Sequence, residues 1–190
     1  MALSSLTSAI TIGASWTAQH NITGTTYSPT QNSSQISKKS SVGTSASNNA
    51  AGGGDELVSF IQSISNSSNT TIDLTNLTDI LSTANTNLAR IKGVIIQLLS
   101  TSDDSTNGTN CTSITVGAAA SNAWTSQSAN RGWLATNTST FDIPNGGAVS
   151  FVTPTANGVL VDGTHKNLFI VNNDSSNAAA VQITLQGASS

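Results

Sequence analysis

The sequence predicts an all-β protein: a β-sandwich, jelly-roll-like or immunoglobulin-like, with about eight or nine strands, one short helix and an extended N-terminal arm. Three observations carry this prediction. Apolar residues recur with a period of two in short runs, most of them after residue 55. Gly, Pro and Asn signals separate these runs. Charged residues make up only 8% of the chain, against roughly 25% in an average soluble domain, and this composition suits surfaces that pack against copies of themselves.

The N-terminal segment "SAITIGASWTAQ", residues 8–19, alternates between two sides. Ile10, Ile12 and Trp16 fall on the apolar side, so the pattern predicts a strand with one buried face. We expect these three side chains to anchor the segment at a subunit interface. An isolated strand has an unpaired edge, which some sheet, its own or a neighbouring subunit's, must accept.

A segment without periodicity follows this strand. Residues 20–54 include the run "NSSQISKKSSVGTSASNNAAGGG" and carry too little apolar surface to offset the entropy cost of ordering. We therefore expect an arm or long loop, together with the N-terminal strand, over residues 1–54. The β-sandwich domain is expected over residues 55–190.

The first half of the expected sandwich contains strand-like runs and one helix-like run. "ELVSFIQSI" and "NTTIDLTNL" predict strands. "NLTDILSTAN" predicts the short helix, with Asn76 or Thr78 as its N-cap and Asp79 in its first turn. "LARIKGVIIQLLS", residues 88–100, is the longest apolar run. Its β-branched centre, Val94-Ile95-Ile96, favours a central strand buried on both faces, with a helix as the alternative.

The second half continues with short strand-like runs. These are "CTSITVGAAA", "STFDIPNGGAVSFVTP", "GVLVDG", "NLFIVNN" and "AAAVQITLQG". "PNGG", residues 144–147, predicts a hairpin turn, because Asn-Gly adopts positive φ at little cost. "NNDSSN", residues 172–177, predicts a looser connection between the last two strands. The expected core includes Phe60, Ile95, Leu98, Phe151 and Ile183.

Charge and hydropathy exclude several classes of partner. The net charge is −3 with six Lys and Arg residues in all, so no basic stripe is available to neutralise phosphates, and no nucleic-acid partner is expected. No apolar stretch approaches the roughly 20 residues of a membrane-spanning helix, and no membrane partner is expected. The opening "MALSSLTSAITIGASW" has no basic segment and no continuous apolar segment, so we expect no signal peptide.

The Asn-x-Ser/Thr triplets of this chain would be modified only in a secretory lumen. They begin at Asn21, Asn32, Asn66, Asn69, Asn76, Asn107, Asn110, Asn137 and Asn173. A chain this rich in Asn, Ser and Thr produces such triplets by chance, so a plain polar surface is the preferred interpretation.

The titratable residues form no pattern typical of catalysis, and we predict no catalytic residue, no cofactor and no metal site. Cys111 has no second thiol to pair with and no nearby His or Lys in the sequence to lower its pKa, and is expected to be a small, half-buried filler. Asp162 and His165 offer two metal ligands in one turn, which is fewer than a site needs. The nucleophile-elbow, Walker A and dinucleotide-binding motifs are absent from the sequence.

Three tryptophans offer an alternative function. Trp16, Trp124 and Trp133 would suit a sugar-stacking platform if their faces were exposed. Trp124 and Trp133 also flank the loop "TSQSANRG", whose Arg131 is one of few cations, and this loop is the predicted contact with a partner.

The stretch from Leu57 to Gly187 resembles a group of small virion structural proteins of tailed bacteriophages and prophages. The resemblance rests on "LARIKGVIIQLLS", "SITVGAAASNAW" and "IPNGGAVSFVTPTANGVLVDGTHKNLFIVNNDSSNAAAVQITLQGAS". The opening "MALSSLTSAITIGASWT" is similar to the usual N-terminus of that group. This chain departs from the group in its Asn/Ser/Thr-rich insert, and in "GAAAS" where a further glycine is usual.

The resemblance implies a structural component of a virus particle, in head or tail. The sequence therefore predicts a non-enzymatic virion protein that self-associates or docks on a capsid or tail lattice, as a decoration or tail component, with the N-terminal arm bridging subunits. Its expected partners are copies of itself and other virion proteins. The alternative is a secreted or surface carbohydrate-binding β-sandwich that uses the tryptophans.

Overall fold

The structure is a computed structural model of the whole chain. It describes residues 56–78, 88–117, 119, 121–124, 134–153 and 158–189, together with the strand backbone of 7–12, 38–43 and 85–86. Within these residues every regular element is a β-strand, which confirms the predicted all-β class.

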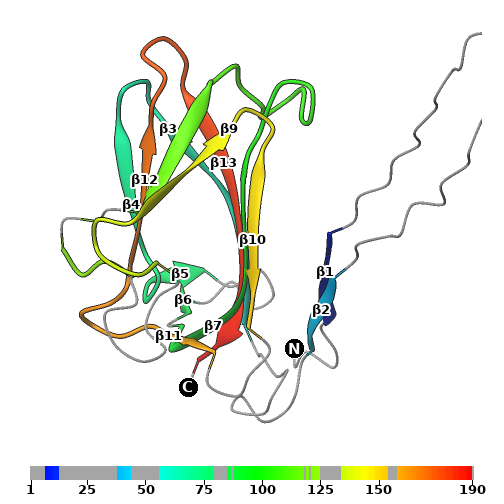
Figure 1. Cartoon of the computed structure of the whole chain (residues 1–190), viewed down its shortest axis with the longest axis vertical. Helices are drawn as coiled ribbons and strands as arrows, with labels where there is room; N and C mark the ends of the chain where they lie inside the picture. The colour runs from blue at the N-terminus through cyan, green and yellow to red at the C-terminus, as the bar shows by residue number, and fades with distance from the viewer. Residues whose placement is uncertain are drawn as a thin grey trace, which may run out of the picture.

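Two antiparallel sheets form the body of the protein and face each other in a β-sandwich-like arrangement (Figure 1). The five-stranded sheet has the order β10-β7-β13-β3, and β11 pairs with β7. Its strands are β3 (Glu56–Ile64), β7 (Arg90–Leu98), β10 (Ala148–Val152), β11 (Val159–Leu160) and β13 (Ala179–Ala188). The four-stranded sheet has the order β4-β12-β8-β9. Its strands are β4 (Asn69–Asp73), β8 (Ser113–Gly117), β9 (Thr140–Pro144) and β12 (Asn167–Asn172).

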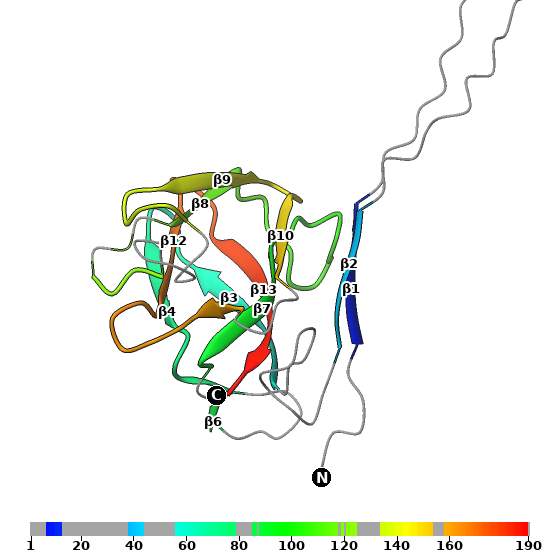
Figure 2. The same ribbon diagram turned by 60° about the horizontal axis from the view of Figure 1, so that its bottom comes forward.

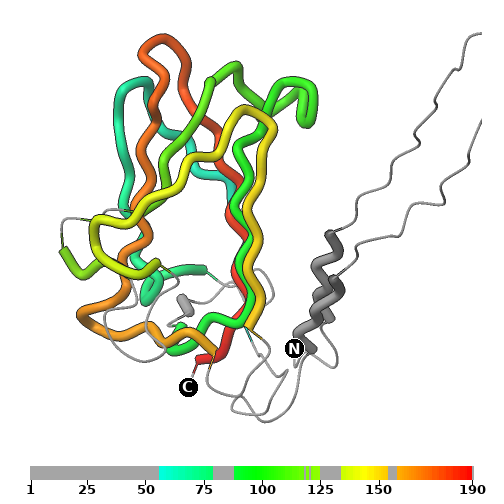
Figure 3. The backbone as a smooth tube through the Cα atoms, viewed as in Figure 1, coloured from blue at the N-terminus to red at the C-terminus, as the bar shows by residue number. Residues whose placement is uncertain are grey.

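Strands that follow each other along the chain mostly lie in opposite sheets. The connections β3–β4, β7–β8, β9–β10, β11–β12 and β12–β13 all cross from one sheet to the other, whereas β8 and β9 are neighbours in one sheet. The C-terminal strand β13 therefore returns to the middle of its sheet, between β7 and β3 (Figure 3).

Two short strand pairs lie outside the main sheets. β1 (Thr7–Ile12) pairs antiparallel with β2 (Lys38–Gly43), so part of the predicted N-terminal strand has strand backbone. β5 (Leu77–Thr78) pairs antiparallel with β6 (Asn85–Thr86). These two strands occupy both ends of the segment expected to be helical, so the helix is not confirmed; residues 79–84 between them lie outside the described residues.

Both sheets contribute to one hydrophobic core. The predicted core residues Leu98 and Ile183 are fully buried, and Phe60 and Phe151 are partly buried and packed against the core. The prediction for Ile95 is wrong, because its side chain is 38% exposed. β7 is a central strand of its sheet, as predicted, and the residues from Ile91 to Val94 are buried without interruption. From Ile95 to Leu98 more exposed and buried residues alternate, so only the first half of β7 is buried on both faces.

The turn at residues 144–147 is present, but it does not close a hairpin. Gly147 N–H donates to the Pro144 carbonyl at 2.8 Å, and Gly146 has a φ of 71°. β9 before the turn and β10 after it lie in different sheets. The prediction of a hairpin is therefore wrong, because a local turn signal does not specify which sheet the next strand joins.

Candidate assembly surface

The outer face of the five-stranded sheet carries no charged side chain in its paired central rows. Antiparallel register aligns outward-facing residues of neighbouring strands, since side chains alternate between the two faces. One row is Ser150, Ile95, Thr184 and Ser59. The rows on either side are Ala148, Gln97, Gln182 and Ile61, and Val152, Gly93, Gln186 and Leu57. Gly93 and Gln186 of the last row are buried, so the exposed part of the face is formed by the other two rows.

Two large apolar side chains are exposed on this face. Ile61 is 43% exposed and Ile95 is 38% exposed, and among the described residues they are the exposed large hydrophobic side chains. Next to Ile95, the hydroxyls of Ser59 and Thr184 hydrogen-bond to each other at 2.9 Å. That pairing lowers the cost of removing these hydroxyls from water, because each already has a partner. The part of the face around Ile61 and Ile95 is therefore suited to being covered by another uncharged surface.

Strand β10 forms an open edge of the same sheet. Leu98 N–H donates to the Gly147 carbonyl at 3.0 Å, and Thr153 N–H donates to the Lys92 carbonyl at 2.8 Å. In an antiparallel pair the residues that bond to the neighbouring strand alternate with residues whose backbone groups point away from it. Counting from these two bonds, the backbone groups of Ala148, Ser150 and Val152 point away from β7.

The edges of the sandwich differ in how they discourage further pairing. β9, an edge of the four-stranded sheet, carries Asp142 and ends in Pro144, and both charge and proline oppose the addition of a strand. β10, with the sequence AVSFV, carries neither. β3, the other edge of the five-stranded sheet, is uncharged after Glu56. The five-stranded sheet therefore has two edges without these protections, β10 and β3.

The N-terminal strand pair lies next to one of these two edges. β2 lies beside β10 (Figures 1 and 2). Ile10 and Ile12 belong to β1 and are in register with Ser40 and Lys38 of β2. Their side chains, and the whole of Trp16, lie outside the described residues, so the roles of all three as interface anchors stay predictions.

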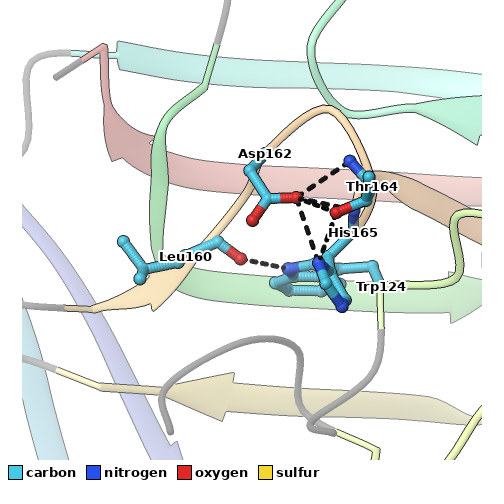
Figure 4. A network of polar contacts seen from close by, with 5 residues as sticks. All are labelled: Trp124, Leu160, Asp162, Thr164 and His165. Atoms are coloured by element: carbon cyan, nitrogen blue, oxygen red, sulfur yellow. Dashed lines mark hydrogen bonds and ion pairs between the residues drawn. The ribbon is translucent and has the colours of Figure 1, made fainter. Parts of the chain in front are cut away.

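The structure places Trp124 in the core rather than on the surface. Its side chain is 2% exposed, and its indole N–H donates to the Leu160 carbonyl at 3.1 Å (Figure 4). The expectation that Trp124 contacts a partner or stacks on a sugar is therefore wrong, because the ring faces the interior. Arg131 and Trp133, which were expected to share that role, lie outside the described residues.

Asp162 and His165 come together in a tight turn (Figure 4). Asp162 Oδ1 accepts hydrogen bonds from the backbone N–H groups of Thr164 and His165, both at 2.9 Å, and lies 3.0 Å from His165 Nδ1. Burial raises the pKa of Asp162, but the hydrogen bonds from Thr164 and His165 outweigh it and hold the pKa below its usual range. The part of the chain that the structure describes brings no group of three or more His, Cys, Asp and Glu residues together.

Cys111 is fully buried, not half-buried as expected from the sequence. Its thiol donates to Asn172 Oδ1 at 3.1 Å and approaches the Ser113 carbonyl at 3.4 Å. Burial raises the pKa of the Cys111 thiol. A thiol that is inaccessible and kept protonated is a packing residue and a poor nucleophile.

The connection at residues 172–177 contains a polar network that the sequence did not reveal. Asn172 is 1% exposed, and its amide Nδ2 lies within hydrogen-bond distance of the carbonyls of Ile64, Ser65 and Asn177. Asp174 accepts from the backbone N–H groups of Ser176 and Thr112 at 2.7 and 3.0 Å. The predicted connection between the last two strands is present and is no hairpin, because β12 and β13 lie in different sheets. Its network joins the end of β3 to the residues just before β8 and β13 at one end of the sandwich.

A buried lysine is a second feature missed by sequence reasoning. Lys92 of β7 has no exposed surface. Its place between Ile91 and Gly93 in the run "ARIKG" was the available signal, because a lysine inside an apolar strand cannot always reach solvent.

The described Asn residues of the Asn-x-Ser/Thr triplets are all exposed. They are Asn66, Asn69, Asn76, Asn107, Asn110, Asn137 and Asn173. Exposure is the ordinary state of asparagine, so a polar surface accounts for this without glycosylation.

The comparisons with known proteins add no family. No protein-family model matches the chain, and no curated protein matches it either. Among the described residues, no helix could cross a lipid bilayer.

Proposed function

We propose that this chain is a non-enzymatic structural protein of a bacteriophage or prophage particle, which self-associates or docks on a capsid or tail lattice. The observation that carries the proposal is the outer face of the five-stranded sheet. Its paired rows are uncharged, and Ile61 and Ile95 stand exposed on it. The resemblance of the sequence to small virion proteins supports the same assignment.

The strand order supports a jelly-roll assignment over an immunoglobulin-like one. In a jelly roll, successive strands mostly lie in opposite four-stranded sheets, with one pair of successive strands adjacent in the same sheet, and the last strand returns between earlier ones. The orders β3-β13-β7-β10 and β4-β12-β8-β9 have this property. Jelly rolls occur in viral capsid proteins and in lectins. Because a fold does not by itself fix a function, the proposal depends on the outer surface and not on the topology alone.

The mechanism is geometric. Burying apolar surface contributes about 25 cal/mol per Å², so two exposed isoleucines on each copy contribute modestly at one contact. Ser, Thr and Ala side chains on the face lose little rotamer entropy when covered. A lattice repeats the same contact on every copy, so weak contacts add up over the particle. The N-terminal strand is proposed to bridge from one copy to an open sheet edge of the next.

Negative-stain imaging of the purified full-length chain, with and without residues 1–19, tests the proposal. The full chain is expected to form regular assemblies, and the truncated chain is expected to stay dispersed while keeping its β-sheet circular dichroism. Assembly that does not depend on residues 1–19 would contradict the bridging arm. A dispersed full-length chain that binds glycans would instead support the carbohydrate-binding alternative, for which Trp16 and Trp133 remain candidates.

A further inference from the structure

We propose that the β10 edge, Ala148–Val152, accepts the β1–β2 ribbon of a second copy of this chain. This inference rests on the proposed function and specifies where the bridging arm binds. The ribbon is defined as β1 with β2, residues 7–12 and 38–43. The contact would extend the five-stranded sheet across two subunits.

The backbone of β10 is ready for an added strand. The N–H and C=O groups of Ala148, Ser150 and Val152 point away from β7, as the bonds at Gly147 and Thr153 require. A row of such groups at the edge of a sheet is a template for another strand. Their side chains belong to the uncharged outer face, so an incoming strand meets no charge there.

The position of the ribbon favours β10 over β3, the other unprotected edge. The chain's own β2 lies beside β10 (Figure 2). Yet β1–β2 remains a separate two-stranded sheet, and β10 remains a terminal strand. Within one chain, β2 therefore lies beside the β10 edge without pairing with it.

The connection to the sandwich is long enough for exchange between copies. Residues 44–55 separate β2 from β3 and can span at most about 40 Å at 3.3–3.6 Å per residue. β3 and β10 are three strand spacings apart, about 14 Å at 4.7–4.9 Å each. A ribbon that can lie beside its own β10 can therefore also reach that of an adjacent copy, as in domain swapping.

Cysteine cross-linking tests both partners of the proposed contact, the β10 edge of one copy and the β1–β2 ribbon of the other. One variant carries Ser41→Cys in β2 and an affinity tag; the other carries Ser150→Cys in β10. The native Cys111 is fully buried, so it gives little background. After mixing and treatment with a short bis-maleimide, a tagged species of two chains is expected. The matched control replaces Ser150→Cys by Ser63→Cys on the β3 edge, and it should give little product.

Three results would overturn the inference. One is equal or greater cross-linking to Ser63→Cys than to Ser150→Cys. Another is a double variant, Ser41→Cys with Ser150→Cys, that cross-links only within one chain. The third is a wild-type chain that assembles while Ser41→Cys and Ser150→Cys never join, which would leave the proposed function intact. A wild-type chain that never assembles would instead overturn the inference together with self-association, and would leave docking on a lattice of other proteins as the form of the proposed function.

A proline substitution, which removes one backbone N–H, provides a second test of the β10 edge. Ser150→Pro removes an N–H that faces away from β7, so it should spare the β7 ladder and raise the concentration needed for assembly about tenfold. Ser63→Pro on the β3 edge is the matched control and should leave that concentration unchanged. Equal effects of the two variants would contradict the choice of β10.

Discussion

Ile95 and Ile96 are neighbours in β7 and point to opposite sides of the sheet: Ile96 is fully buried, whereas Ile95 is 38% exposed. Ile96 lies opposite Ile183 and Val149, both on the core side, and Ile95 lies opposite Thr184 and Ser150 on the outer face. One strand thus presents a residue that stabilises the fold beside a residue that is available to a partner.

Substitutions at these two residues should have different effects: one at Ile96 should lower stability, and one at Ile95 should weaken assembly. Ile96→Ala should lower the free energy of unfolding by about 2–5 kcal/mol, because it opens a cavity in the core. Ile95→Lys should change it by less than about 1 kcal/mol and should weaken self-association, since a lysine must then be desolvated at the contact. Chemical denaturation and sedimentation measure the two effects. Unchanged assembly of Ile95→Lys would exclude the outer face as the contact.

Asn172 should be among the polar residues most important for stability. Asn172→Ala deprives the buried Ile64 carbonyl of a donor and removes the buried acceptor of the Cys111 thiol and of the Asp174 N–H. Each unsatisfied buried group costs about 1–3 kcal/mol, so we expect a loss of at least about 2 kcal/mol. Asn173→Ala, next to it and exposed, is the control and should cost much less. Equal costs would show that the network contributes little.

Acid should destabilise the sandwich partly through Asp174. Backbone hydrogen bonds from Ser176 and Asn177 hold the pKa of Asp174 below its usual range. A carboxyl group whose pKa is lower in the folded than in the unfolded chain adds stability above its unfolded pKa of about 3.9, and this stability is lost as the pH falls below that value. The urea midpoint of Asp174→Asn should therefore be lower than wild type at neutral pH and fall less on acidification. If the urea midpoints of the wild type and Asp174→Asn fell by the same amount as the pH is lowered, this role of Asp174 would be contradicted.

Gly117 should not tolerate a side chain. Its φ is +115°, and a Cβ at this position would lie 2.3 Å from the Ser139 carbonyl oxygen. Gly117→Ala should therefore destabilise the protein by about 1–3 kcal/mol or more. Gly163→Ala is the matched control, because a Cβ there meets nothing within 4 Å. Thermal unfolding of both variants checks the difference, and similar midpoints would show that β8 adjusts at little cost.

Cys111 should react with thiol reagents only after unfolding. Its side chain has no exposed surface, and burial raises the pKa of its thiol. Labelling at mildly alkaline pH should be slow in the native protein and fast in denaturant, with the native rate following the opening of the structure. Fast labelling of the folded chain would show that the end of the sandwich around Cys111 and Asn172 opens readily.

Local periodicity was sufficient to predict the all-β class and most strand positions. The central run at Val94-Ile95-Ile96 was misjudged because all three residues are apolar, which hides the alternation that the structure shows. A half-exposed isoleucine in such a run resembles a core residue in sequence. The same ambiguity concealed the outer face, which is the principal feature of the candidate assembly surface.

Features that depend on distant parts of the chain could not be predicted. The turn at 144–147 was recognisable, but the sheet that β10 joins is set by its pairing with β7. Trp124 lies between polar segments, and it is buried in a core built from distant strands, where the carbonyl of Leu160 accepts its indole N–H. The buried network of Asn172 and Asp174 lies in a run of polar residues that, taken alone, is typical of a solvated loop.

Light scattering of the full-length chain at neutral pH, over a wide range of concentration, tests the central claim most directly. Self-association through the outer face of the five-stranded sheet predicts a mass that rises above the 19.2 kDa of one chain as the concentration increases. In Ile95→Lys the mass should stay closer to that of one chain. A mass of one chain at every concentration up to about 1 mM would mean that any self-contact is weaker than roughly 4 kcal/mol, and it would contradict the claim.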